Sequence, residues 1–157
     1  MRRIGSTGMA LAAGLVLAVP GFAQEIVTKQ YEDGSVYEGE FANGRQNGTG
    51  TYRLPSGYEY TGQWVDGAIQ GQGKARFPNG SVYEGAFVAG KPQGKGKITF
   101  ADGGTYEGDW TDGKMTGQGT ANYATGSTYS GAFVDGQYEG QGVLTDSSGY
   151  RYEGAWA

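Results

Sequence analysis

The chain has 157 residues and a formal net charge of -4, and it contains 32 glycines, 12 tyrosines and neither cysteine nor histidine. Without cysteine and histidine it can form no disulfide framework and no zinc site of the usual ligand set, and it has no imidazole-activated nucleophile. The glycine content is far above ordinary globular usage, which indicates a periodic sequence.

The first residues have the order that is typical of a secretory signal peptide. Arg2 and Arg3 precede an apolar run, residues 9–19, that is too short to span a bilayer. Gly21 and Ala23 then place small residues at positions -3 and -1 relative to a cleavage site after Ala23. We expect residues 1–23 to be a bacterial signal peptide removed after Ala23, and the protein to be periplasmic or secreted. The alternative is a buried N-terminal helix.

The charge of the expected mature chain, residues 24–157, limits its partners. Loss of Arg2 and Arg3 leaves ten basic and 16 acidic side chains, so the net charge becomes -6. An acidic chain does not track nucleic-acid phosphates, and it lacks the polybasic segment that holds proteins on anionic lipid. We therefore expect no nucleic-acid partner, and phospholipid or membrane association is only a distant alternative.

A motif of the form Tyr-x-Gly-x-Phe/Trp occurs six times at a constant spacing of 23 residues. Its aromatic residues form what we call the aromatic stripe: Tyr37, Phe41, Tyr60, Trp64, Tyr83, Phe87, Tyr106, Trp110, Tyr129, Phe133, Tyr152 and Trp156. Its central glycines are expected to be structural: Gly39, Gly62, Gly85, Gly108, Gly131 and Gly154. Of the 32 glycines, 27 lie at five periodic positions, so the glycine content is a property of the repeat.

Each repeat has the pattern of a β-hairpin. Residues 36–42 alternate aromatic and polar side chains, which predicts a strand with one buried face, and residues 48–54 predict its antiparallel partner. Asn43 and Gly44 tolerate positive φ and predict the hairpin turn between the two strands. Asp33 and Gly34 predict the turn that precedes a hairpin. No helix signal follows the N-terminal apolar run.

The strand register can be predicted from side-chain size. If large residues cover glycines, Tyr37 lies opposite Leu54, Gly39 opposite Tyr52, and Phe41 opposite Gly50. The other face of the sheet is expected to be solvated because it carries polar side chains, in the first unit Glu38, Glu40, Thr51 and Arg53.

These residues resemble the MORN (membrane occupation and recognition nexus) repeat, whose usual pattern is Tyr-x-Gly-x-Trp/Phe followed by x-x-Gly-x-x-x-Gly-x-Gly. The resemblance covers a half unit (24–34), five full units (35–149) and a second half unit (150–157). It implies an all-β fold, namely an elongated single-layer antiparallel sheet of tandem hairpins with about 12 strands. It also implies a role in binding and scaffolding.

No group of residues in the sequence predicts catalysis. The periodic carboxylates occupy equivalent solvated positions, whereas acid and base catalysis needs two groups in different environments. Each Asp-Gly turn supplies one carboxylate where calcium needs six to eight oxygens, and no Gly-Lys-Ser/Thr phosphate loop occurs. We therefore expect a protein that is not an enzyme, with no catalytic residue, metal or cofactor. Asp146, at a position that is otherwise apolar, is interpreted as loosening the array near its end.

The aromatic stripe is the candidate binding site. A single-layer sheet has no second layer to cover its apolar face, so most rings are expected to pack on one another while the others remain exposed in a groove. Trp64 and Trp110 are the strongest candidate contact residues if the groove is open. In that case, replacing both with Ala weakens binding more than folding, and equal losses would identify them as core residues.

Two binding hypotheses remain open at this point. In the first, the groove or a sheet edge takes a protein segment or a second copy, since residues 150–156 form the first half of a hairpin whose second half is residues 24–34. A head-to-tail contact would complete that unit. In the second, rings repeated about every 9.6 Å stack on a cell-envelope glycan, because that spacing is close to a disaccharide step. We expect protein binding or scaffolding ahead of glycan binding.

Overall fold

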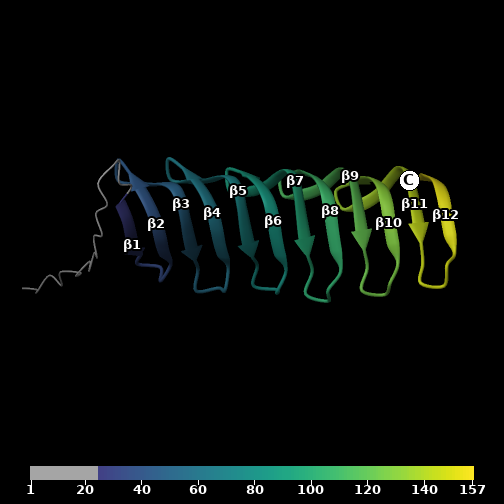
Figure 1. The fold of residues 1–157 in the computed structure, drawn as a ribbon, viewed down its shortest axis with the longest axis horizontal. Helices are drawn as coiled ribbons and strands as arrows, with labels where there is room; N and C mark the ends of the chain where they lie inside the picture. The colour runs from purple at the N-terminus through teal and green to yellow at the C-terminus, as the bar shows by residue number, and fades with distance from the viewer. Residues whose placement is uncertain (1–24) are drawn as a thin grey trace, which may run out of the picture.

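A computed structural model describes residues 25–157, which form one open antiparallel sheet of 12 strands without a helix. The all-β prediction is confirmed, whereas the expected signal peptide, residues 1–23, lies outside the described residues. The strands follow one another in the sheet in sequence order (Figure 1). They are β1 (Glu25–Gln30), β2 (Val36–Ala42), β3 (Arg45–Arg53), β4 (Glu59–Val65), β5 (Ala68–Arg76), β6 (Val82–Val88), β7 (Lys91–Thr99), β8 (Thr105–Thr111), β9 (Lys114–Asn122), β10 (Thr128–Val134), β11 (Gln137–Thr145) and β12 (Arg151–Trp156).

Each hairpin joins a strand of seven residues to one of nine through a two-residue turn. In the first unit Asn43 and Gly44 have φ values of 51° and 76°, which is the backbone that was predicted for them. This tight turn pairs Ala42 with Arg45, so β3 begins three residues earlier than the predicted partner strand.

The predicted register is wrong, because it assumed an uninterrupted ladder. Tyr37 lies opposite Tyr52 and Gly39 opposite Gly50, while Phe41 lies opposite Gln46. Between the last two pairs the register shifts, since one residue of β2 faces three residues of β3. The hairpin therefore has two registers. Next to the turn the turn itself fixes the pairing, and beyond the bulge the strands pair with a shift of two residues.

A positive-φ glycine and a side-chain acceptor accommodate this irregularity. Gly48 has a φ of 100°, and the backbone N–H of Thr49 donates to a Glu40 carboxylate oxygen at 2.6 Å. Gln63 and Asp109 accept the corresponding N–H groups of later units at 2.6 and 2.9 Å. In these three units the polar side chain after the motif glycine thus replaces a ladder hydrogen bond that the bulge removes, whereas Ala86, Ala132 and Ala155 at the equivalent positions have no such acceptor.

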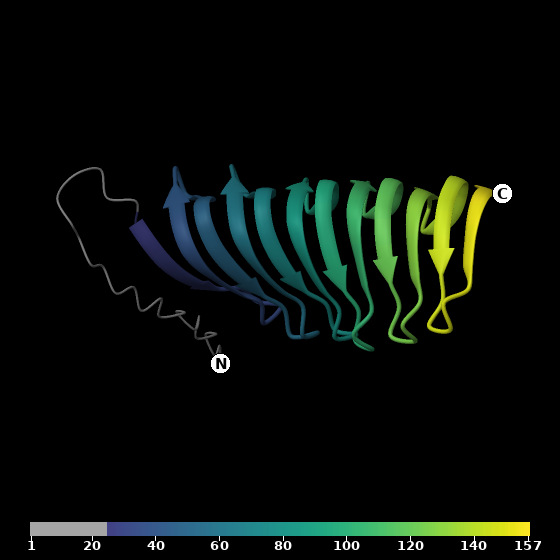
Figure 2. The same cartoon turned by 45° about the vertical axis from the view of Figure 1, so that its right-hand side comes forward.

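The core is a continuous chain of rings on one face of the sheet, which we call the inner face. Tyr60 contacts Phe87 of the next unit with 5.0 Å between ring centroids and an interplanar angle of 81°, and Tyr83 meets Trp110 in the same way. Edge-to-face contacts of this kind add to the burial of apolar area. The strands bow along their length, and a single layer without a covering layer can bury these rings only through such curvature (Figure 2).

The opposite face, here called the outer face, is polar as predicted. Rows of directly opposed side chains cross the sheet, and Lys74 of β5 forms an ion pair with Glu84 of β6 at 2.7 Å. Lys95 and Asp109 form another pair between β7 and β8. Three of these four side chains are more than half exposed and Asp109 is one-third exposed, so the pairs contribute little to stability.

Candidate functional site: an apolar groove beside the aromatic stripe

Most of the aromatic stripe lies in the core. Nine of its 12 residues are buried, and the tyrosines of the five full units have no exposed surface. Phe41 and Trp156 are half-buried, while Tyr152 of the terminal strand β12 is 38% exposed. The structure therefore brings all 12 predicted residues together on one face but leaves few ring surfaces open to a ligand.

The two tryptophans expected to be contact residues are also covered. Trp64 and Trp110 are 6% and 5% exposed, and their indole N–H groups donate to the carbonyl oxygens of Gly50 and Gly96 at 3.2 and 3.0 Å. The hydrogen bond fixes each ring against the preceding hairpin. Their role in binding stays a prediction, but their surroundings show that Ala at either position would also remove core packing.

The six motif glycines lie where the ring chain leaves no room for a side chain. A Cβ atom on Gly62 would lie 2.5 Å from the Cα of Gly73 on the neighbouring strand and 2.6 Å from the Tyr60 hydroxyl oxygen. In the five full units each tyrosine ring lies over the pair of glycines that face one another across the hairpin, and its hydroxyl donates to a backbone carbonyl, as Tyr60 does to Gln63 at 2.9 Å. Glycine is thus required here for space rather than for flexibility.

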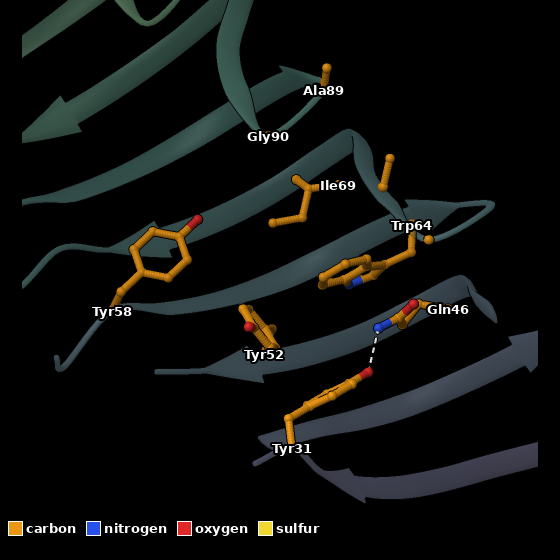
Figure 3. Close-up of a pocket in the computed structure, with 10 residues that line it drawn as sticks. Tyr31, Gln46, Tyr52, Tyr58, Trp64, Ile69, Ala89 and Gly90 are labelled. Atoms are coloured by element: carbon orange, nitrogen blue, oxygen red, sulfur yellow. Dashed lines mark hydrogen bonds between the residues drawn. The ribbon is translucent and has the colours of Figure 1, made fainter. Parts of the chain in front are cut away.

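The open part of the inner face lies beside the buried rings, in what we call the groove. One cavity in it, of about 480 Å³, is lined by residues of the three successive strands β3, β4 and β5 and of four turns (Figure 3). Tyr52 lies between Tyr31 and Tyr58 in this cavity, and Ile69 lies on the far side of Trp64 from Tyr31. No hydrogen bond within residues 25–157 uses the Tyr52 and Tyr58 hydroxyl groups.

A second cavity, of about 270 Å³, lies about two units further along the groove. Phe100, Met115 and Tyr123 line it, together with Asp102 at its margin. Phe100 and Tyr123 are 37% and 41% exposed, so apolar surface on these side chains is open to a ligand. Both cavities therefore have an aromatic lining and few polar groups, as sites for small or extended ligands commonly do.

Two side-chain bridges cross the groove near its ends. In the first unit the Gln46 amide donates to the Tyr31 hydroxyl at 2.7 Å (Figure 3). Four units later, at the equivalent positions, the Tyr138 hydroxyl donates to the Tyr123 hydroxyl. Desolvation raises the pKa of both Tyr31 and Tyr138, so both phenols remain protonated at ordinary pH.

Between the bridges the equivalent positions are apolar. They pair Leu54 with Ile69, Phe77 with Pro92, and Phe100 with Met115 by sequence position. None of these side chains can form such a bridge. The groove thus has an apolar stretch of three units with a polar crossing at either end.

These groove residues were not predicted from the sequence, because the predicted site residues come from the motif positions whose side chains recur in every unit. The positions equivalent to Gln46 and to Tyr31 recur with the same period of 23, yet their side chains change from unit to unit. Their recurrence every 23 residues, with side chains that differ between units but are mostly apolar, is the feature from which they could have been predicted to line a groove.

The turns between hairpins, which we call the first rim, carry charge of only one sign. These turns, at 31–35, 54–58, 77–81, 100–104, 123–127 and 146–150, contain four acidic residues and no basic one: Glu32, Asp33, Asp102 and Asp146. A Ser35 hydroxyl donating to Asp33 holds the pKa of that carboxyl below its usual value, and Ser148 does the same for Asp146. The first rim is therefore negatively charged at neutral pH.

The two edge strands differ in their fit to the repeat. In β12, Tyr152 and Gly154 keep the motif, but β1 has Glu25 and Val27 where the other second strands have glycine. The glycine equivalent to Val27 in the preceding hairpin, Gly142, lies under the Tyr129 ring with no space for a Cβ atom. Val27 of a second copy would meet Tyr152 in that way, which opposes the head-to-tail contact expected from the sequence.

The acidic residues and the secondary structure of the described part of the chain bear on two further kinds of site, a metal site and a membrane-spanning helix. Residues 25–157 contain no cluster of three acidic side chains close enough to hold a metal ion. Across the same residues, no helix has the length and apolar character needed to cross a membrane.

Comparison with known proteins agrees with this architecture. The family model described as "MORN repeat" matches residues 37–57, 60–82, 83–105, 106–128 and 129–149. No curated protein matches the chain. Among solved structures, the Drosophila melanogaster SAS-4 (dCPAP) TCP domain in complex with a proline-rich motif of Ana2 is similar at a TM-score of 0.52 and 16% identity, over 85% of this chain and 77% of that one. The Danio rerio CPAP TCP10 domain in complex with a STIL peptide gives 0.45 and 16%, over 85% and 75%.

Proposed function

Because this chain belongs to the MORN repeat family, we propose that it is a non-catalytic binding protein whose groove holds an extended segment of a partner protein. The observation that carries the proposal is the apolar stretch between the two bridges, with its two cavities. A long, narrow apolar surface with periodic pockets fits a chain of residues better than a compact ligand.

Similarity of fold adds support. The Drosophila SAS-4 domain, whose structure contains a proline-rich motif of Ana2, shares the single-layer sheet at a TM-score of 0.52. At 16% identity the likeness concerns the fold alone. The likeness to the SAS-4 domain supports the proposal only because it shows that a sheet of similar fold can hold a peptide.

The glycan alternative has weaker support than protein binding. A sugar ring stacks on the open face of an aromatic ring, and the faces of the stripe residues are occupied by neighbouring rings at about 5 Å. Open aromatic surface in the groove belongs instead to Phe100 and Tyr123, which line a cavity, while Tyr150 and Tyr152 are exposed at the C-terminal end of the array.

Export from the cytoplasm is the second part of the proposal. Arg2 and Arg3, the apolar run 9–19 and the small residues Gly21 and Ala23 support it. Expression of the full chain in a bacterium, cell fractionation and N-terminal sequencing would test it. The proposal predicts a mature form in the periplasm or medium that begins at Gln24, and an unprocessed cytoplasmic chain would contradict it.

The binding proposal can be tested by selecting linear 12-residue peptides from a displayed random library on residues 24–157. Two matched variants distinguish the faces: Phe100→Ser in the groove and Val88→Ser on the outer face, with wild-type exposures of 37% and 46%. We expect selected peptides to lose binding to the Phe100→Ser variant and to keep binding to the Val88→Ser variant. Failure to select any peptide, or equal loss in both variants, would refute the proposal.

A further inference from the structure

The spacing of the groove's repeating sites can be compared with the repeat of an extended ligand. One unit contributes two strands, and strands lie about 4.8 Å apart, so equivalent groove positions recur about every 9.6 Å. A polyproline II helix has three residues per turn and rises about 3.1 Å per residue, which gives about 9.3 Å per turn. Every third side chain of such a helix therefore meets an equivalent site, with a mismatch of only about 0.3 Å per unit.

A β-conformation does not match in the same way. Side chains of a strand face one side at every second residue, about 6.7 Å apart, so the next inward side chain misses the equivalent position of the next unit by about 2.9 Å, and only every third one comes near an equivalent position, two units away. Edge pairing of a strand also needs free backbone groups, and strands β2 to β11 are paired on both sides. Only β1 and β12 have an unpaired edge among the described residues.

The polar groups of the groove suit a ligand whose backbone is unpaired. Carbonyl groups of a polyproline II helix make no internal hydrogen bonds and need donors. The Tyr52 and Tyr58 hydroxyls take part in no hydrogen bond within residues 25–157 and stand at the first cavity (Figure 3). Aromatic-lined grooves with such donors are how proline-rich segments are generally recognised.

The charge of the first rim adds a second requirement. The three rim turns between the bridges, at 54–58, 77–81 and 100–104, contain one carboxylate, Asp102 beside the second cavity, and no basic residue. Glu32, Asp33 and Lys29, which lies over the Tyr31 ring, stand at the first end. A ligand side chain that points to this rim is therefore attracted if it is basic. In a three-fold helix, one face can be apolar toward the groove while the next face is basic toward the rim.

We propose that the segment held in the groove is a basic, proline-rich chain in the polyproline II conformation, with one residue in three facing successive units. This rests on the proposed function and specifies its partner class. The apolar stretch of three units is about 29 Å long and accommodates about nine residues of such a helix. The bridges at Tyr31 and Tyr123 mark its two ends.

Fluorescence anisotropy with labelled peptides on residues 24–157 tests the proposal. The probe is four repeats of Leu-Pro-Arg, compared with a peptide of the same composition whose order removes the three-residue period, and with an alternating Val-Arg peptide of equal length and no proline. We expect the period-three peptide to bind at least several-fold more tightly than the other two. Equal or tighter binding of either control would overturn the inference.

Charge recognition has its own matched pair of variants. Asp102→Asn on the first rim and Asp109→Asn on the outer face each remove one charge while keeping an oxygen that accepts the local backbone N–H. We expect the first to weaken binding of the period-three peptide several-fold and the second to leave it unchanged. Equal effects would contradict recognition by the rim.

The outcomes also separate this inference from the proposed function. If the library yields groove-dependent peptides but the period-three peptide does not bind, the ligand class is wrong while the groove remains the site. If the library yields none and the period-three peptide does not bind, both proposals fail.

Discussion

At the scale of single residues, the array is held by a tyrosine that lies over two facing glycines. Tyr83 covers Gly85 and Gly96 and donates its hydroxyl to the Ala86 carbonyl oxygen at 2.9 Å. The ring is fully buried although the sheet is a single layer, because the neighbouring rings lie edge-on against it. Each central hairpin thus builds its core from two aromatic residues, a tyrosine and a Phe or Trp, and from two glycines that leave room for the tyrosine ring.

Gly96→Ala tests this arrangement. The added Cβ atom would lie 2.5 Å from Cε2 of Tyr83, so the ring must leave its place. We expect the free energy of unfolding to fall by about 2–4 kcal/mol. Gly57→Ala is the control, since a Cβ atom there meets nothing within 4 Å and only the φ of 95° is unfavourable. Denaturant titration should give a loss of about 1 kcal/mol for the control, and similar losses for both variants would contradict the account.

The buried tyrosines also predict how stability depends on pH. Burial raises the pKa of Tyr60 and Tyr83 to about 12, whereas a tyrosine in the unfolded chain keeps a value near 10. Below pH 10 both states are protonated and stability is complete; above it the unfolded chain loses protons first, so stability falls as pH rises toward 12. Denaturant titrations at pH 8 to 11.5 should show this fall, with a smaller slope in the Tyr83→Phe variant. A constant stability, or an unchanged slope, would refute it.

At the scale of the hairpin, most of the design can be predicted from the sequence. Alternation of aromatic and polar residues locates each first strand, and Asn43 with Gly44 locates the turn between strands. The register is not predictable in the same way, because it depends on a bulge beside Gly48 that the sequence shows only as one more glycine. Size matching chose a large residue opposite each glycine, whereas the tyrosine ring reaches the glycine pair diagonally.

One of the five turns within hairpins has an unusual residue at its first, positive-φ position. Ala89 has a φ of 48°, where the other four units have Asn or Asp. Ala89→Asn should raise the free energy of unfolding by about 0.5 kcal/mol, because Asn tolerates this backbone better than Ala. Ala101→Asn is the matched control, since Ala101 is exposed and does not have positive φ. Equal thermal shifts in the two variants would show that the backbone conformation is not the cause.

At the scale of the whole molecule, the sequence predicts an elongated array and an aromatic face but not where that face stays open. The curvature buries the motif positions that are always aromatic, as with Trp64 and Trp110, and the groove is lined by positions whose side chains differ more between units, such as Ile69 and Met115. The curvature of the sheet depends on side-chain packing in all of its units. It therefore cannot be predicted from the sequence of a single motif.

The two ends of the array predict its oligomeric state. Because Glu25 and Val27 replace the glycines that the repeat requires, residues 24–157 should not associate head to tail. The double variant Glu25→Gly, Val27→Gly removes the obstacle and should form concentration-dependent oligomers. Light scattering coupled to size exclusion measures both proteins, with residues 150–157 deleted as the control. Wild-type oligomers that this deletion abolishes would contradict the prediction.

The central claim is that a protein segment binds in the groove, and methyl NMR tests it most directly. Ile69 and Met115 report on the groove, whereas Val65, Val88 and Val134 report on the outer face, where they are about half exposed. On titration with a peptide recovered from the library, we expect the shifts of the first two methyl groups to move and those of the three valines to remain in place. Movement confined to the valines, or to residues of the edge strands β1 and β12, would contradict the account.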